Sequence, residues 1–353
     1  MGATPSPFAG RRRALSLWSA IVVRKHACSI ISSPLLRMKP VRAAALAGVR
    51  MNKGRLGRPL KRLVELALTL VAAMIVVVVF FRAFENRFVY YPPHYPDGFD
   101  SPKVYGLAPV EVWIEARDGA KLNAWFLAAP SSAKVLLWFH GNAENIGMGL
   151  EQMKAFARLG VNILALDYRG YGKSEGSPDE AGVYRDGQAA YEYLVQTRRF
   201  EPKNIILYGH SLGGAVAVDV ASKNPCGGLI VESSLSSGRE MARLIFHVPG
   251  IGYIFKSRFD SAEKIPSVRA PVLIIHGTRD RVIPFWMGRK LYDAAREPKS
   301  FFAVEGAGHN DVLAVGGEPY LARLGAFLET PERVRAEPAR PSGPARPAGY
   351  SKV

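Results

Sequence analysis

Residues 205–214, which read IILYGHSLGG, decide the fold of this 353-residue chain. The apolar residues at the start predict a buried β-strand, and the alanine- and valine-rich segment that follows predicts a helix over 212–223. Between them, Gly209, Ser211 and Gly213 fit the Gly-x-Ser-x-Gly pattern of a sharp strand-to-helix turn that exposes a serine hydroxyl above a sheet. Small residues are needed beside the serine because backbones crowd at such a turn. The stretch therefore predicts Ser211 as a nucleophile.

A second match to the same pattern, at 172–176, shows that the pattern alone is a weak signal. No apolar strand leads into Ser174, and no helix begins after it, because Gly176-Ser177-Pro178 follows. We therefore interpret Ser174 as a turn residue of a loop.

Apolar segments alternate with amphipathic segments on both sides of the central stretch. A hairpin about Asp118-Gly119, with strands at 110–115 and 122–127, comes first. Apolar strands that alternate with helices are typical of a parallel sheet covered on both faces. We expect an α/β protein with a doubly wound, mostly parallel, eight-stranded sheet and a short cap at about 233–269. The other strands are predicted at 134–139, 161–167, 204–209, 228–232, 271–277 and 300–304, and the helices at 144–159, 180–197, 212–223, 284–296 and 318–328.

Two further residues supply the chemistry that a serine nucleophile needs. A serine hydroxyl requires a base that takes its proton and an acid that orients this base. Asp280 follows the strand predicted at 271–277, and His309 follows the strand predicted at 300–304, so both lie where ligands bind in such sheets. Taken singly, Asp280 also fits a turn or helix-capping residue, and His309 a solvated loop residue. In the order Ser, Asp, His they predict a triad with Ser211.

The oxyanion of an acyl-transfer intermediate needs two N–H donors. The backbone N–H of Leu212, the residue after the nucleophile, is one predicted donor. The second is the backbone N–H of Asn142 in the loop after the third strand, although His140 and Asn142 also fit ordinary turn residues. We interpret the loop 167–174 as a brace for this site, with Arg169 at the border of the pocket.

Five motifs together resemble the α/β-hydrolase superfamily over about residues 88–330. The resemblance is strongest to a membrane-anchored branch related to serine aminopeptidase-like lipases and to the eukaryotic α/β-hydrolase-domain depalmitoylases. It implies the α/β-hydrolase fold, with Ser211 as nucleophile, Asp280 as acid and His309 as base. It also implies one amino-terminal anchor before a hydrolase of acyl esters or thioesters, which needs no cofactor and no metal. The motifs are His140-Gly141-Asn142-Ala143, DYRGYG at 167–172, GHSLGG at 209–214, His276-Gly277 with Asp280, and Gly308-His309-Asn310-Asp311.

The chain also departs from this family pattern. Glu144 stands where the oxyanion loop often carries glycine. The cysteine-rich amino terminus of the depalmitoylases is absent, since the chain has only Cys28 and Cys226. Two cysteines are too few for a disulfide-rich scaffold, and neither has the spacing to other Cys or His residues that a structural zinc site requires. We therefore do not extend protein depalmitoylation to this chain.

The net charge of +17 belongs to the two ends of the chain. Residues 1–62 carry 14 Lys and Arg and no acidic residue, and residues 331–353 carry five basic and two acidic residues. Residues 63–330 are neutral, with 28 basic and 28 acidic residues. We therefore expect no nucleic-acid partner for the folded body.

Residues 66–81 form an uncharged, strongly apolar run of 16 residues. A spanning helix needs about 20 apolar residues, with about 17 as the lower end, and the four valines Val76–Val79 suit a soluble helix poorly. We predict an uncleaved transmembrane signal anchor at 63–82, because no small-x-small cleavage site follows the run. Lys and Arg precede it in excess, which predicts a cytoplasmic amino terminus and an extracytoplasmic catalytic domain. A buried helix and a cleaved signal peptide are the alternatives.

The expected organisation has five parts: a basic, mostly disordered segment at 1–62, the anchor at 63–82, a connector at 83–109, the hydrolase domain at 110–330 and a disordered tail at 331–353. We favour a start of translation at Met38 or Met51, since Met51 opens a compact basic segment before the apolar run. The alternative is a start at Met1, with residues 1–50 as a targeting presequence, because they carry no acidic residue.

The substrate is inferred from the anchor and the cap. A short cap with many apolar residues, held near a bilayer, favours small-molecule or lipid substrates with an acyl ester or thioester bond; an alternative is that these apolar residues only cover the sheet. A non-catalytic binding scaffold of the same fold, a peptidase and a cofactor-free haloperoxidase are the competing functions. Dehalogenase chemistry is excluded because it needs an aspartate at the position of Ser211.

Overall fold

The computed structural model describes residues 57–95, 102–248 and 250–333. The predictions for residues 1–56 and 334–353, including the start of translation, lie outside the described residues. The chain divides into two compact units, residues 1–66 and 67–353. The second unit contains the whole sheet and the helix α2 from Ala67 onward.

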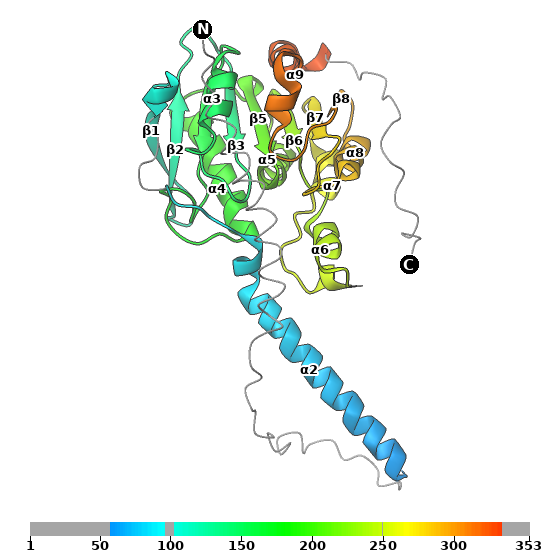
Figure 1. Cartoon of the computed structure of the whole chain (residues 1–353). Coiled ribbons are helices and arrows are strands. Elements are labelled where there is room, and N and C mark those ends of the chain that lie inside the picture. Colours follow the sequence, from blue (N-terminus) through cyan, green and yellow to red (C-terminus); the bar gives the residue numbers. More distant parts are fainter. Residues whose placement is uncertain (1–56, 96–101, 249, 334–353) are drawn as a thin grey trace, which may run out of the picture. The chain divides into compact units, whose positions relative to one another are not determined.

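Eight strands form one sheet in the order β1-β2-β4-β3-β5-β6-β7-β8 (Figure 1). β2 pairs antiparallel with β1 and with β4, and all other neighbours are parallel. The predicted doubly wound, mostly parallel sheet is therefore confirmed. The strands are β1 (Val110–Glu115), β2 (Lys121–Leu127), β3 (Val135–Phe139), β4 (Asn162–Leu166), β5 (Ile205–His210), β6 (Gly228–Glu232), β7 (Val272–Gly277) and β8 (Lys299–Val304).

Helices cover both faces of this sheet. α3 (Leu150–Ala157) and α9 (Val312–Glu329) contribute to the buried cluster on one face. α4 (Glu180–Glu192), α5 (Leu212–Lys223) and α8 (Phe285–Ala294) contribute to the cluster on the other face. Short helical turns complete the connections: η1 (Pro102–Tyr105), η2 (Tyr193–Thr197), η3 (Pro202–Asn204) and η6 (Pro331–Arg333).

Three helices differ from their predicted bounds by more than two residues. The helix predicted at 180–197 is an α-helix only to Glu192, and the π-helical turn η2 continues it to Thr197. The helix predicted at 144–159 begins only at Leu150, because the Asp167 carboxylate accepts the backbone N–H of Ile146 and holds the preceding residues in turns. The helix predicted at 318–328 is preceded by a further helical segment, which a non-helical Gly317 at φ 51° separates from it.

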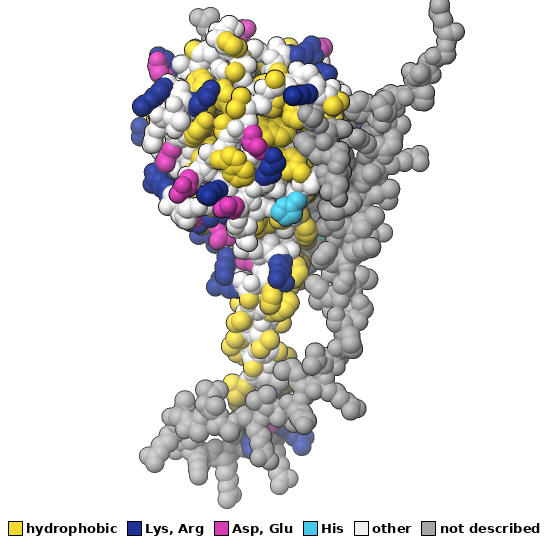
Figure 2. Space-filling model, turned by 90° about the vertical axis from the view of Figure 1, so that its left-hand side faces the viewer, with side chains coloured by type: hydrophobic (Ala, Val, Ile, Leu, Met, Phe, Trp, Pro, Cys, Tyr) yellow, Lys and Arg dark blue, Asp and Glu magenta, His cyan; other side chains and the backbone are white. Residues whose placement is uncertain are grey.

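α2 (Arg58–Val89) is longer at both ends than the anchor predicted at 63–82. Residues 59–89 form a helix long and apolar enough to cross a membrane, and its most apolar window is not buried in the protein. Figure 2 shows hydrophobic side chains along this helix, whereas basic and acidic side chains lie interspersed on the visible face of the body. α2 is therefore a candidate membrane span.

The segment between β6 and β7, which includes the predicted cap, consists of short helices and turns. α6 and η4 pack against α2, because Phe81 and Val89 contact a small cluster around Ile251 and Phe255. The elements of the segment are α6 (Gly238–Phe246), η4 (Ile251–Tyr253), α7 (Ser261–Lys264) and η5 (Ile265–Ser267).

Candidate functional site

Ser211 stands on the turn between β5 and α5. Its backbone has φ 55° and ψ −119°, a positive-φ conformation that residues other than glycine rarely adopt. The chain passes very close to itself here. A Cβ on Gly209 would lie 2.2 Å from the Gly213 oxygen, and a Cβ on Gly213 would lie 2.1 Å from the Phe139 oxygen. The two glycines therefore permit the turn that presents the serine side chain.

The structure brings the three residues of the predicted triad together. His309 Nε2 lies 3.0 Å from Ser211 Oγ, and His309 Nδ1 lies 2.7 Å from Asp280 Oδ2. Asp280 Oδ1 accepts the backbone N–H groups of Val282 and Ile283, both at 2.8 Å. These two bonds fix the orientation of the carboxylate that faces the imidazole.

The electrostatic surroundings favour a neutral imidazole beside an ionised carboxylate. Burial lowers the pKa of His309 more than the hydrogen bond with Asp280 raises it, and the charge of His210 lowers it further. Burial alone raises the pKa of Asp280, but the imidazoles of His276 and His309 hold it well below its usual range. A neutral imidazole in this position can accept a proton from a serine hydroxyl near neutral pH.

The two predicted oxyanion donors belong to different segments, the start of α5 and the loop after β3. Leu212 is the first residue of α5, where backbone N–H groups have no acceptor within the helix. Asn142 lies in the loop after β3, and its side chain is held by three contacts. Its Oδ1 accepts from the Tyr171 hydroxyl at 2.7 Å and the Tyr91 N–H at 3.4 Å, and its Nδ2 donates to the Val89 oxygen at 2.6 Å. The end of α2 therefore holds this loop directly.

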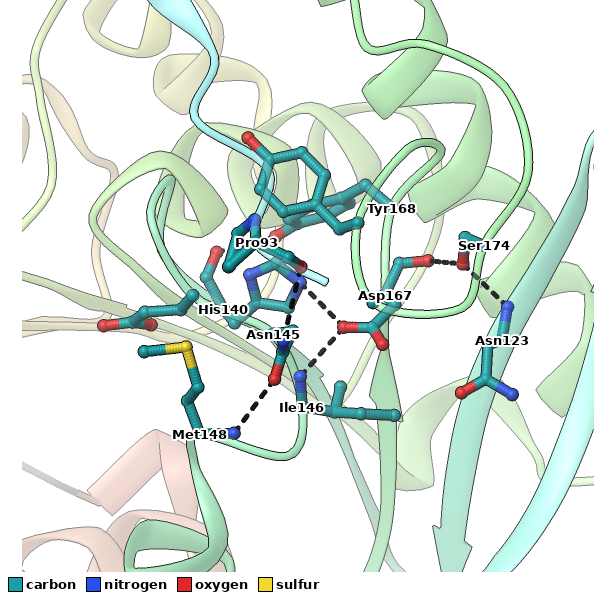
Figure 3. A network of polar contacts seen from close by, with 12 residues as sticks. Pro93, Asn123, His140, Asn145, Ile146, Met148, Asp167, Tyr168 and Ser174 are labelled. Atoms are coloured by element: carbon teal, nitrogen blue, oxygen red, sulfur yellow. Dashed lines mark hydrogen bonds and ion pairs between the residues drawn. The ribbon is translucent and has the colours of Figure 1, made fainter. Parts of the chain in front are cut away.

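A buried polar network braces the same loop (Figure 3). His140 Nε2 lies 3.3 Å from Asp167 Oδ1, which also accepts the backbone N–H of Ile146 at 2.8 Å. The Tyr168 hydroxyl donates to the His140 backbone oxygen at 2.9 Å. His140 thus supports the loop from inside the protein.

The loop 167–174 is also tied into the body. The buried Ser174 hydroxyl donates to the Asp167 oxygen at 2.7 Å and accepts the Asn123 N–H at 2.8 Å (Figure 3). Arg169 is buried and donates to the Asp186 carboxylate of α4 at 2.7 Å. Both side chains fasten the loop to the body, as expected of a brace, and the place of Arg169 at the border of the pocket stays a prediction.

Sequence reasoning missed a charged pair next to Ser211. His210 Nδ1 lies 3.6 Å from Glu144 Oε1, and Glu144 Oε2 accepts the Gly141 N–H at 2.8 Å. His210 Nε2 lies 3.1 Å from the His309 oxygen. The pair therefore links the loop after β3 to the loop that carries His309. The sequence contained one sign of this pair, since Glu144 stands where the oxyanion loop often carries glycine.

Both members of this pair are ionised at neutral pH. Burial alone lowers the pKa of His210, but the attraction of Glu144 outweighs it and raises the pKa to about 9. Burial alone raises the pKa of Glu144, but His210 lowers it to about 2. A positive charge therefore lies next to the proposed base and contributes to its lowered pKa.

No metal site accompanies these residues in the part of the chain that the structure describes, because no three His, Cys, Asp or Glu side chains are arranged to hold an ion. A cavity of about 430 Å³ lies among residues such as Phe126, Asn162 and Phe200. It contains none of the site residues, so it does not belong to this site.

Comparisons with known proteins identify relatives of the chain. Residues 130–255 match the family model described as serine aminopeptidase, S33. An uncharacterized protein of Mycobacterium tuberculosis is 33% identical over 275 residues, which cover 76% of this chain and 96% of that protein. Alpha/beta hydrolase domain-containing protein 17C of Mus musculus is 41% identical over 230 residues, which cover 63% of this chain and 68% of that protein.

A solved structure, that of an esterase from Pyrococcus furiosus, has the same fold. It superposes with a TM-score of 0.57 and 22% identity, and covers 68% of this chain and 98% of that protein. At this identity, the likeness concerns the arrangement of the sheet and its helices.

Proposed function

We propose that this chain, which belongs to the α/β-hydrolase superfamily, is a serine hydrolase that cleaves ester or thioester bonds of acyl substrates. One observation carries the proposal: the continuous line of short contacts from Ser211 Oγ through His309 to Asp280, at 3.0 and 2.7 Å. Each residue follows a different strand of one sheet, and each has the chemical type that its role requires.

In the proposed reaction, His309 Nε2 takes the proton of Ser211 while Oγ attacks the carbonyl carbon and a tetrahedral oxyanion forms. The backbone N–H groups of Leu212 and Asn142 are the proposed donors to this oxyanion. The bond to the alcohol or thiol then breaks, and the leaving group receives the proton from His309. Water, activated by the same base, attacks the acylated Ser211 and releases the carboxylic acid. Asp280 keeps the proton on Nδ1 and stabilises the imidazolium.

Two features support a lipophilic substrate and a membrane location. α2 is a candidate anchor, and its last residue, Val89, binds the side chain of Asn142 at the proposed oxyanion site. The reacting groups would therefore work close to a bilayer. The excess of Lys and Arg before α2 supports a cytoplasmic amino terminus and an extracytoplasmic catalytic domain.

The proposal is tested with the full chain in nanodiscs and a series of esters with short, medium and long acyl chains. A matched thioester and an amino-acid amide are measured in parallel, with Ser211→Ala as the control. We expect kcat/KM to rise from short to medium chains, esters and thioesters to be cleaved, and Ser211→Ala to be inactive. Rates independent of chain length would overturn the acyl specificity, and cleavage of the amide alone would favour a peptidase. A folded protein that cleaves nothing would favour a binding scaffold.

A further inference from the structure

An exposed apolar surface lies on α6 and the segment that follows it. Ile245, Phe246, Val248 and Tyr253 are 52%, 37%, 51% and 61% exposed, and these four residues are called the cap surface here. Single exposed apolar residues are ordinary, whereas several on one short segment indicate a contact surface.

The cap surface adjoins the end of the apolar run of α2. Phe81, the last residue of that run, contacts Phe246 and Phe255 with ring centroids 6.3 and 6.0 Å apart. Arg82, the first charged residue after the run, donates through Nε to the Ile254 oxygen at 3.1 Å. If α2 spans a bilayer, the cap surface therefore lies at the level where the hydrocarbon ends and the headgroups begin.

Buried polar contacts hold α2 and the cap together. The Glu85 carboxylate is 2% exposed and accepts the backbone N–H groups of Lys256 and Ser257 at 2.7 and 2.6 Å. A buried carboxylate is costly unless such donors satisfy it. The helix and the cap therefore form one structure, and the position of one at the bilayer determines the position of the other.

The charge around the cap surface is positive. Four basic side chains on α2 and in the cap are exposed: Arg82, Arg87, Arg243 and Lys256. The single acidic residue between 238 and 258 is Glu240, and its carboxylate pairs with a lysine of α8 at 2.7 Å. Apolar side chains with cations beside them are the combination that binds the interface of anionic membranes.

We propose that the cap surface inserts into the headgroup region of an anionic bilayer beside α2, and that the site draws acyl substrates from that bilayer. The first part goes beyond the proposed function and depends only on the contacts above. The second part rests on the proposed function.

The first part is tested by placing an environment-sensitive NBD label at Val248→Cys, in the full chain with Cys28→Ser and Cys226→Ser. The matched control carries the label at Val315→Cys, which is also half-exposed but lies on α9. In nanodiscs of phosphatidylcholine and phosphatidylglycerol, we expect doxyl-labelled lipid to quench the label at 248 and aqueous iodide to quench the label at 315. Equal quenching by iodide at both positions would overturn the proposal. Protection of position 248 that depends on protein concentration would instead assign the surface to a second copy of the chain.

The second part is tested with the triple variant Ile245→Ser, Phe246→Ser and Val248→Ser. We expect about tenfold slower hydrolysis of a long-chain ester in anionic vesicles and an unchanged rate on a water-soluble short-chain ester, which also shows that the variant folds. The control Val104→Ser, Val315→Ser removes exposed apolar residues elsewhere and should leave both rates unchanged. Equal effects on the two esters would overturn delivery from the bilayer. If the wild type cleaves neither ester, the proposed function fails while the labelling experiment still decides the position of the cap surface.

Discussion

Replacement of Asp280 by asparagine removes a charge and nearly preserves the shape of the side chain. In the structure, Oδ1 accepts the N–H groups of Val282 and Ile283, and Oδ2 faces His309 Nδ1 at 2.7 Å. An asparagine must keep its carbonyl oxygen toward the two N–H donors, because an NH₂ group cannot accept from them. Its NH₂ group therefore faces His309.

This NH₂ group can donate only to an unprotonated Nδ1, so the proton of His309 moves to Nε2, the nitrogen 3.0 Å from Ser211 Oγ. Nε2 then cannot take the serine proton. In a Ser-His-Asp triad the wrong tautomer lowers kcat by about 10⁴-fold, which corresponds to about 5.5 kcal/mol of activation free energy. We expect KM to change little, since Asp280 is not proposed to touch the substrate.

The assay measures kcat and KM of Asp280→Asn on the best ester and follows thermal unfolding by circular dichroism. The melting temperature should stay near that of the wild type, because both backbone donors keep their acceptor. Asp311→Asn is the matched control, since Asp311 lies in the His309 loop and its carboxylate accepts the backbone N–H of Gly308 at 2.6 Å. A folded Asp280→Asn enzyme that keeps more than about a tenth of the wild-type kcat would refute the reasoning.

Three further predictions concern pH and packing. Because the pKa of His309 is lowered, kcat/KM should persist as the pH falls through 6.5 and decline only below it; a pH–rate profile with its acid limb above 6.5 would contradict this. Glu144→Gln removes the charge that raises the pKa of His210 from 6.5 to about 9, so the pair stabilises the wild type fully below pH 6.5 and loses this effect as the pH rises to 9. Between pH 6.5 and 9, the free energy of unfolding of the wild type should fall by up to about 3 kcal/mol relative to that of the variant. The measurement is denaturant unfolding of both proteins across this pH range, and free energies of unfolding that change in parallel would contradict the prediction. Gly213→Ala places a Cβ 2.1 Å from a backbone oxygen and should lower the free energy of unfolding by at least about 1–3 kcal/mol. The control Gly325→Ala, whose Cβ meets only a side-chain atom at 3.7 Å, should not destabilise the protein. Equal melting temperatures of the two variants would exclude the close approach at Gly213.

The sheet and the position of its turns could be predicted because their signals are local. The helix over 212–223 and the strand over 228–232 agree with the structure at both ends. Ser211, Asp280 and His309 each follow a parallel strand of one sheet. The predicted topology alone therefore placed all three at the carboxyl ends of these strands. Their mutual distances follow from the turns and could not be read from the pattern.

The contacts that the sequence did not reveal join segments far apart in the chain. Glu144 pairs with His210, and Val89 binds Asn142, although no local pattern connects these residues. The length of the helix that contains the predicted anchor depends on such a distant contact too. The charge at Arg82 indicates the end of an apolar run. In the structure, however, the Arg82 side chain donates to the Ile254 oxygen of the cap, and the helix continues to Val89.

The identity of the nucleophile is tested most directly by labelling the full chain with a fluorophosphonate and mapping the adduct by peptide mass spectrometry. Wild type, Ser211→Ala and Ser174→Ala are compared at equal concentrations of folded protein. We predict an adduct on Ser211 in the wild type and in Ser174→Ala, and none in Ser211→Ala. A folded wild type that never reacts, or an adduct on Ser174, would contradict the proposed hydrolase mechanism.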